Sequence, residues 1–253
     1  MKLGYVLDGP DDAPVLALSG GLGTTTVMWD AQVTVFADRF RVLRIDHPGH
    51  GRSPVPDRRV TVDDIGRSFV ELLDELGIAS AAFCGLSLGG MVGQWLGANA
   101  ADRIERLVLA CTAASLDARE LYEERAALVR REGIEVVVDG ARERWFTPAF
   151  RNTPAADRII EELRRIPAEG YAAGCEAVGA FDARADLQRI APPTLVLYGE
   201  EDSVTPPAVI DELATIPHAR KTGIPNAAHL ASVERPEAFS AAVLSHLTEG
   251  VAA

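Results

Sequence analysis

The chain has few cysteines, and none of its apolar runs is long. Its 253 residues contain three cysteines, Cys84, Cys111 and Cys175, and no C-x-x-C pair. This small, odd number excludes a disulfide framework, and free cysteines in apolar runs are typical of small buried side chains. No stretch approaches the roughly 20 consecutive apolar residues of a membrane helix. We therefore expect a soluble protein from a reducing compartment.

Positive charge is also scarce. Lys and Arg total 25 against 37 Asp and Glu, so the formal net charge is −12 at pH 7. Nucleic acids and anionic membranes are bound by clustered positive charge, so we expect neither as a partner. The first five residues lack the apolar segment and the small-residue cleavage site of a secretory signal. We expect a cytoplasmic protein.

The chain does contain short apolar runs that alternate with helical patterns, which is typical of an α/β fold. Its length fits one domain with an inserted segment. Nearly continuous apolar runs at 15–18 and 107–110 predict strands that are buried on both faces of a mainly parallel sheet. The predicted strands are 3–7, 15–18, 41–45, 81–84, 107–110, 194–198 and 220–224. Helices that cover the sheet are predicted from residue 62 to 77 and from 236 to about 247.

The middle of the chain has a different texture. Between residues 116 and 187 strand-like runs nearly vanish, and charged helical segments such as 120–131 and 155–165 take their place. This pattern predicts a core formed by residues 1–115 and 188–253, with a helical cap inserted at 116–187. The expected architecture is a mostly parallel central sheet flanked by helices.

A glycine-rich turn around Ser87 is the most informative motif. The sequence Gly-Leu-Ser-Leu-Gly-Gly at 85–90 follows a predicted strand and precedes a helical stretch. This G-x-S-x-G pattern in a strand–turn–helix context is typical of a nucleophile elbow, which exposes a serine hydroxyl above the sheet. The pattern predicts acyl transfer through a covalent serine intermediate.

An acid and a histidine follow Ser87 in the chain order Ser, Asp or Glu, His. The strand predicted at 194–198 leads into a loop that contains Glu200, Glu201 and Asp202, and His229 follows the last short strand. Loops after C-terminal strands carry the other members of a Ser-His-acid triad in α/β-hydrolase enzymes. At this point any of the three acids can be the partner of the histidine.

The sequence positions of the four other histidines favour non-catalytic roles. His47 and His50 lie in Asp-His-Pro-Gly-His-Gly, a turn after the third strand, where we expect a structural role. His218 lies beside a proline in a connection, and His246 lies in the last helix. The histidines show no metal-binding spacing, and the glycine run at 20–23 lacks the Gly-Lys-Ser/Thr ending of a phosphate loop. We predict no metal and no cofactor.

The chain resembles the α/β-hydrolase superfamily over essentially its whole length, and within it is most similar to 3-oxoadipate enol-lactonases. The stretches that carry the resemblance are 18–25 with Met28-Trp29-Asp30, 83–91 around the serine, Arg-Trp-Phe-Thr-Pro at 144–148, Asp186-Leu187 with 193–196, and His229-Leu230 with Val233-Glu234. Enol-lactonases commonly have Ser-Asn-Ser where this chain has Ser19-Gly20-Gly21.

The resemblance implies a role for each candidate residue. Ser87 is the nucleophile, His229 the general base and Asp202, rather than its two glutamate neighbours, the acid that holds the imidazole. The backbone N–H groups of Leu88 and Gly21 stabilise the oxyanion. The implied substrate is a small lactone or ester.

The resemblance also directs attention to Arg144 and Trp145 in the predicted cap. An enol-lactone with an acetate arm needs an apolar pocket and a cation, and the planar fork of arginine suits a carboxylate. Alternatively, Arg142, Glu143 and Arg144 form a solvated helix face while Trp145 packs the cap onto the core.

The leading hypothesis is hydrolysis of 3-oxoadipate enol-lactone. A general carboxylesterase or a cofactor-free perhydrolase or haloperoxidase would use the same serine, and a binding protein can share the fold without the reaction. The oligomeric state is not predicted.

Overall fold

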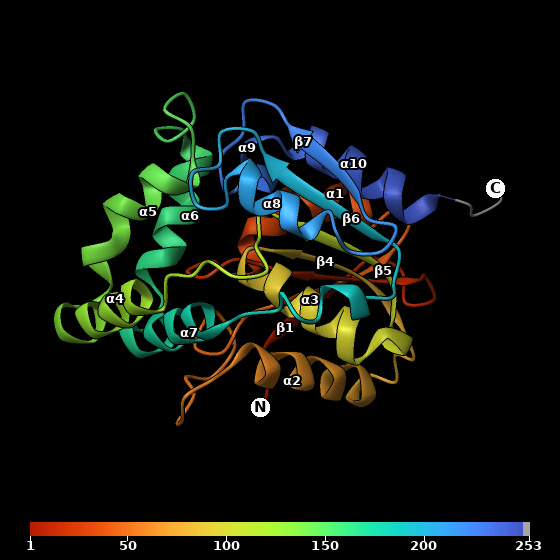
Figure 1. Ribbon diagram of the computed structural model, residues 1–253, viewed down its shortest axis with the longest axis horizontal. Coiled ribbons are helices and arrows are strands. Elements are labelled where there is room, and N and C mark those ends of the chain that lie inside the picture. The colour runs from red at the N-terminus through yellow and green to blue at the C-terminus, as the bar shows by residue number, and fades with distance from the viewer. Residues whose placement is uncertain (250–253) are drawn as a thin grey trace.

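A seven-stranded sheet lies at the centre of the computed structural model, which describes residues 1–249 (Figure 1). The strand order is β1-β3-β2-β4-β5-β6-β7, and every neighbouring pair is parallel except β1 and β3. The strands are β1 (Tyr5–Asp8), β2 (Val15–Ser19), β3 (Arg41–Ile45), β4 (Ala81–Leu86), β5 (Ile104–Ala110), β6 (Thr194–Gly199) and β7 (Arg220–Ile224). The predicted mostly parallel α/β architecture is confirmed.

The strand predictions differ from the structure mainly at their ends. The predicted bounds of β3 and β7 are those observed. β4 continues two residues further, because Gly85 and Leu86 pair with Leu109 and Ala110. β1 starts at Tyr5 instead of residue 3, and the N–H of Gly4 donates to Ser53 Oγ (2.7 Å) instead of a strand partner.

Helices cover both faces of the sheet. α2 (Val62–Glu75) and α3 (Leu88–Asn99) lie on one face, and α1 (Asp30–Phe36) and α10 (Pro236–Thr248) lie on the other (Figure 1). α8 (Pro207–Leu213) and the short α9 (Ala231–Glu234) follow β6 and β7. The predicted helix at 62–77 begins as expected, with a capping box between Thr61 and Asp64, and ends two residues early, before Gly77. None of the helices within residues 1–249 is long and apolar enough to cross a lipid bilayer.

Residues 116–187, which we name the α4–α7 insertion, separate β5 from β6 in the chain. They contain α4 (Arg119–Glu132), α5 (Val138–Trp145), α6 (Pro154–Arg164) and α7 (Ala168–Ala180), and Figure 1 shows these helices together at one end of the sheet. The two ends of the insertion meet, because Ser115 and Asp182 form a β-bridge and the N–H of Ala183 donates to the carbonyl of Ala114 (2.8 Å). α4 and α6 match the helical segments predicted at 120–131 and 155–165.

Candidate active site

Ser87 lies in the sharp turn between β4 and α3. Its backbone has φ 56° and ψ −114°, a conformation that residues other than glycine rarely adopt. The N–H of Ser87 donates to the carbonyl of Ala110 on the neighbouring strand (2.9 Å), and Thr112 Oγ1 donates to the carbonyl of Ser87 (2.8 Å). These contacts hold the serine above the carboxyl end of the sheet.

The flanking glycines make this turn possible. A Cβ atom at Gly85 would lie 2.1 Å from the carbonyl oxygen of Gly89, and one at Gly89 would lie 2.1 Å from the carbonyl oxygen of Ser19. Backbone occupies the space that a side chain would need at both positions. The spacing of the G-x-S-x-G motif is therefore a packing requirement of the elbow.

The structure brings Ser87 together with the predicted histidine and acid. His229 Nε2 lies 3.0 Å from Ser87 Oγ, and His229 Nδ1 lies 2.8 Å from Asp202 Oδ2. His229 and Asp202 are buried, whereas Ser87 is partly accessible. A hydroxyl, an imidazole and a carboxylate in this order can move a proton from the serine and stabilise the resulting imidazolium.

Asp202 is held as a carboxylate by its own loop. Its Oδ1 accepts from the N–H groups of Val204 (2.7 Å) and Thr205 (3.0 Å), and its Oδ2 accepts from Thr205 Oγ1 (2.6 Å) and His229. Burial raises the pKa of Asp202, but the charge of His229 and these hydrogen bonds outweigh burial and lower the pKa to about 2. Glu200 and Glu201, the alternative acids, are exposed.

The two predicted oxyanion donors lie on either side of Ser87. Leu88 begins α3, where the first N–H groups have no acceptor within the helix. Gly21 follows β2, and a Cβ atom built on it would lie 3.4 Å from Ser87 Cβ. Within residues 1–249 no acceptor binds the N–H of Gly21. Both N–H groups are therefore free to donate to a substrate oxygen.

The other histidines lie outside this triad. His47 and His50 are buried beside the Gly21 loop: His47 Nε2 lies 2.8 Å from the carbonyl oxygen of Gly20, and His50 Nε2 accepts from the N–H of Gly23 (3.1 Å). His218 is exposed, and His246 contacts the carbonyl of Pro193. Across the described chain, no group of three His, Cys, Asp or Glu side chains is arranged to hold a metal ion.

A cavity of about 240 Å³ opens onto Ser87 and His229. Most of its wall is apolar or aromatic and comes from the α4–α7 insertion. The lining residues from the insertion are Leu116, Ala118, Leu121, Tyr122, Arg125, Ala141, Arg144, Trp145, Tyr171 and Val178. A small organic molecule bound here would lie between the insertion and the candidate triad.

Two arginines of the insertion face this cavity. The guanidinium of Arg125 lies 4.7 Å from the ring centre of Tyr122, and Arg144 is half-buried on α5. Neither arginine forms an ion pair with an acid of the described chain. Burial and the charge of Arg125 lower the pKa of Arg144, whereas the neighbouring Tyr171 and Tyr122 outweigh burial and raise the pKa of Arg125. Arg125 is not among the residues predicted from the sequence.

The side chains of the stretch around Arg144 have different neighbours in the structure. Arg142 is half-buried, as Arg144 is; it pairs with Asp157 (2.7 Å) and donates to the carbonyl of Arg151 (2.6 Å). Arg144 instead faces the cavity. Trp145 lines the cavity and also packs the insertion onto the core, and its carbonyl accepts from the N–H of Leu230 (3.0 Å).

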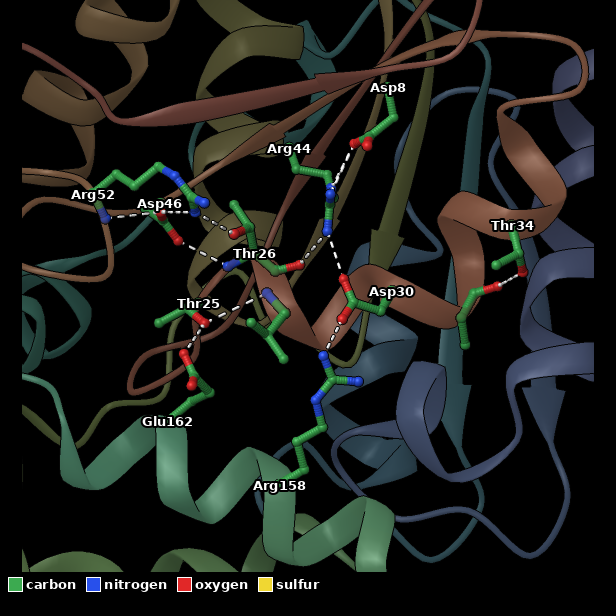
Figure 2. A network of polar contacts seen from close by, with 12 residues as sticks. Asp8, Thr25, Thr26, Asp30, Thr34, Arg44, Asp46, Arg52, Arg158 and Glu162 are labelled. Carbon is green, nitrogen blue, oxygen red and sulfur yellow. Dashed lines mark hydrogen bonds and ion pairs between the residues drawn. The ribbon is translucent and has the colours of Figure 1, made fainter.

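A polar network fixes the insertion to the segment that follows the Gly21 loop (Figure 2). Thr25 Oγ1 donates to Glu162 Oε2 (2.9 Å), and Arg158 pairs with Asp30. Asp30 in turn pairs with Arg44 of β3 (2.7 Å). The network joins α6 to the sheet beside the candidate oxyanion loop.

A buried glutamate joins the insertion to the histidine loop. Glu234, on α9, accepts from the N–H of Ala228 (3.0 Å), the N–H of Thr147 (3.3 Å) and the hydroxyl of Thr147. Thr147 follows α5, and Ala228 directly precedes His229. One carboxylate therefore connects the cavity wall with the candidate base. The sequence resemblance included Glu234 but gave no role for it.

With this geometry in place, comparison with known proteins identifies the family. The alpha/beta hydrolase family matches residues 15–242. The chain belongs to this family. Acinetobacter baylyi 3-oxoadipate enol-lactonase 2 is 38% identical and covers 96% of this chain and 92% of its own. The crystal structure of the enol-lactonase from Burkholderia xenovorans LB400 has a TM-score of 0.94 and 39% identity, covering 98% of this chain and 96% of its own.

Members of the family with other names are also similar to this chain. A thermophilic esterase from Thermogutta terrifontis, whose structure contains malate, has a TM-score of 0.91 and 30% identity, covering 98% of this chain and 93% of its own. The predicted superfamily and fold are confirmed. Because esterases and lactonases share this architecture, the fold leaves the choice of substrate open.

Proposed function

We propose that the protein hydrolyses 3-oxoadipate enol-lactone to 3-oxoadipate through an acyl-enzyme on Ser87. One observation carries the proposal: a single cavity holds the hydroxyl and imidazole of Ser87 and His229 together with two arginines, Arg125 and Arg144, that have no acidic partner in the described chain. A lactone with a carboxylate arm has an ester carbonyl for Ser87 and His229 and an anionic group for the two arginines. The similarity to two enol-lactonases supports this substrate.

In the proposed reaction His229 accepts the proton of Ser87 as the serine oxygen attacks the lactone carbonyl. The N–H groups of Leu88 and Gly21 donate to the oxyanion, and Asp202 stabilises the imidazolium. Collapse of the tetrahedral intermediate breaks the ring C–O bond, and His229 returns the proton to the leaving enol oxygen. Water, activated by His229, then hydrolyses the acyl-enzyme, and the enol tautomerises to the ketone.

In this proposal residues 116–187 act as a cap that selects the substrate. The cap contributes ten of the cavity-lining side chains, including both arginines, whereas the core contributes the triad. We propose that Arg125 and Arg144 bind the acetate arm and that Trp145 covers its ring. Guanidinium groups at the end of an apolar pocket favour anionic over neutral substrates.

Replacing the arginines tests this recognition. Arg144→Leu and Arg125→Leu should each raise KM for the anionic lactone by about tenfold, which corresponds to one charge-assisted hydrogen bond. KM for neutral p-nitrophenyl acetate should stay unchanged. Arg142→Leu is the matched control, since Arg142 lies on the same helix and pairs with Asp157. Equal effects on anionic and neutral substrates would contradict carboxylate binding.

A substrate panel with product identification tests the reaction itself. The purified protein should consume the enol-lactone far faster than p-nitrophenyl acetate, and mass spectrometry should identify 3-oxoadipate. Ser87→Ala should abolish turnover of both and retain the folded circular dichroism spectrum. A preference for neutral esters would indicate a general esterase, and peroxide-dependent halogenation in acetate buffer would indicate a perhydrolase.

A further inference from the structure

The proposed oxyanion donor of Gly21 belongs to the peptide that joins Gly20 to Gly21. In a planar trans peptide the C=O and N–H groups point in opposite directions. The orientation of the Gly20 carbonyl therefore determines where the N–H of Gly21 points. Among the described residues the N–H of Gly21 has no acceptor, and Gly21 lies against Ser87.

Two donors hold the Gly20 carbonyl. His47 Nε2 lies 2.8 Å from this oxygen, and the N–H of Gly89 donates to it at 2.9 Å. Because a carbonyl oxygen only accepts, the proton of the His47 ring must be on Nε2. Ser19 Oγ, the other neighbour of this nitrogen, is more distant at 3.4 Å. Gly89 belongs to the elbow itself, so His47 is the side chain that adds to the backbone contact.

Stability does not explain a histidine at this position. His47 is 2% exposed, and its Nδ1 has no partner in the part of the chain that the structure describes. Burial, reinforced by nearby His50 and only partly offset by the bond to Gly20, lowers the pKa of His47 to about 4. A neutral ring with an unsatisfied buried nitrogen costs about 1–3 kcal/mol, which an apolar side chain would avoid.

We propose that His47 is a positioning residue for the oxyanion hole. Its Nε2–H fixes the Gly20–Gly21 peptide so that the N–H of Gly21 points to the oxygen that becomes negative. A hydrogen bond to a peptide carbonyl also polarises the N–H of the same peptide, which strengthens it as a donor. The inference rests on the proposed acyl transfer at Ser87, but not on the identity of the acyl group.

His50 provides a matched control. It is fully buried in the same turn as His47 and its ring centre lies 6.2 Å from that of His47. Its Nδ1 donates to the carbonyl of Pro48 (3.0 Å), and its Nε2 accepts from the N–H of Gly23 (3.1 Å). His50 thus supports the same loop without contacting the donor peptide.

The test compares His47→Leu, which removes the donor, with His47→Gln, which retains a side-chain N–H, and with His50→Leu. For each variant we would measure kcat and KM with an ester that the wild type hydrolyses. Affinities would be measured for two inhibitors: an alkylboronic acid, whose adduct with Ser87 is a tetrahedral anion, and adipate, which forms no adduct.

His47→Leu should lower kcat and boronate affinity by a similar factor of about ten or more, with KM and adipate affinity nearly unchanged, because only the anionic state uses the donor. His47→Gln should recover most of both losses, and His50→Leu should lower kcat much less than His47→Leu. Equal losses in His47→Leu and His47→Gln, or equal losses in boronate and adipate affinity, would overturn the proposal. If His47→Leu does not fold, the comparison of His47→Gln with His47→Asn, whose shorter side chain cannot reach Gly20, decides in the same way.

Failure of the proposed acyl transfer at Ser87 gives a different result. In that case Ser87→Ala would retain the activity of the wild type, or the wild type would hydrolyse none of the esters. If activity depends on Ser87 but kcat and boronate affinity are unchanged in His47→Leu, only the proposed role of His47 is refuted.

Discussion

At the scale of single residues, the backbone of Ser87 carries strain. A φ of 56° with ψ of −114° is sparsely populated for any residue with a Cβ atom, and such conformations cost of order 1–3 kcal/mol. The turn nevertheless imposes it, because β4 and α3 meet at a point where glycine backbones touch. The strain aims the hydroxyl at His229 and so contributes to the arrangement of the site.

This strain predicts that the backbone conformation of Ser87 lowers the free energy of unfolding. Ser87→Gly should raise the free energy of unfolding by about 1 kcal/mol, because glycine adopts positive φ without penalty. Ser87→Ala keeps the Cβ atom and should leave stability nearly unchanged, and both variants should lose turnover. Urea unfolding followed by circular dichroism measures the difference. A Ser87→Gly variant less stable than Ser87→Ala would refute the strain.

At the scale of secondary-structure elements, loops from distant parts of the chain are fixed to one another by buried polar groups. Glu234 connects the end of α5 with the loop before His229, and His47 and His50 connect the turn after β3 with the loop after β2. Each connection joins a loop that carries a candidate site residue to a second loop. The geometry of the site therefore depends on these connections as well as on the strands.

Removing the charge of Glu234 should loosen the histidine loop. Glu234→Gln retains the shape of the side chain but weakens three charge-assisted bonds and should destabilise the protein by about 2 kcal/mol. It should also lower kcat, because His229 follows the residue that Glu234 holds. Thr147→Val, which removes one hydroxyl donor, is the milder control. Unchanged melting temperature and kcat in Glu234→Gln would show that the bonds are dispensable.

Two of the buried histidines, His47 and His50, predict a loss of stability at mildly acidic pH. Burial lowers the pKa of both His47 and His50 from 6.5 to about 4, so the unfolded chain binds more protons than the folded chain between these pH values. Stability should therefore fall as pH decreases from about 6.5 to about 4, by about 2 kcal/mol per histidine between pH 7 and pH 5. Asp202, with a pKa of about 2, titrates below this window. Urea midpoints at pH 7 and 5 measure the effect, and His50→Gln should reduce it. A flat profile would show that these histidines can accept protons in place.

At the scale of the whole molecule, the insertion is tightly packed onto the core. Gly170 of α7 faces Gly49 in the turn after β3: a Cβ atom on Gly170 would lie 2.3 Å from the carbonyl oxygen of Gly49. Together with the network around Arg158 and Glu162, this contact holds the insertion against the loop that carries Gly21. Insertion and core should therefore unfold as one cooperative unit.

A methyl group at the contact tests this coupling. Gly170→Ala should destabilise the protein by about 1–3 kcal/mol, although alanine is the better helix former, because backbone must move to make room. Gly140→Ala is the control within the insertion, since its Cβ atom would approach only the mobile tip of Arg144 (2.8 Å). That variant should lose less stability than Gly170→Ala, because a side-chain end moves more easily than backbone. Scanning calorimetry would show a single transition throughout, and a separate early transition for the insertion would contradict the coupling.

The sequence predicts those features of the structure that are determined by residues close together in the chain. Strands buried on both faces appear as continuous apolar runs, and the elbow is visible because its glycines are neighbours of Ser87. Arg125 was missed because its place in the cavity wall depends on how α4 packs against α7. The bond between Thr147 and Glu234 joins residues 87 positions apart, and the bond between Gly20 and His47 joins residues 27 apart. No local sequence pattern shows which loops meet, so these contacts could be identified only from the structure.

The wall formed by Arg125 and Arg144 has a consequence for the end of the proposed catalytic cycle. In the proposed cycle a lactone with one carboxylate enters as a monoanion, and hydrolysis of the acyl-enzyme produces a dianion inside a chain whose own net charge is −12. If Arg125 and Arg144 bind the arm as proposed, the new carboxylate forms beside Ser87, where the described residues of the cavity wall include no third arginine to pair with it. The proposed product thus carries one more negative charge than the substrate, and we expect the negative net charge of the chain to assist its release.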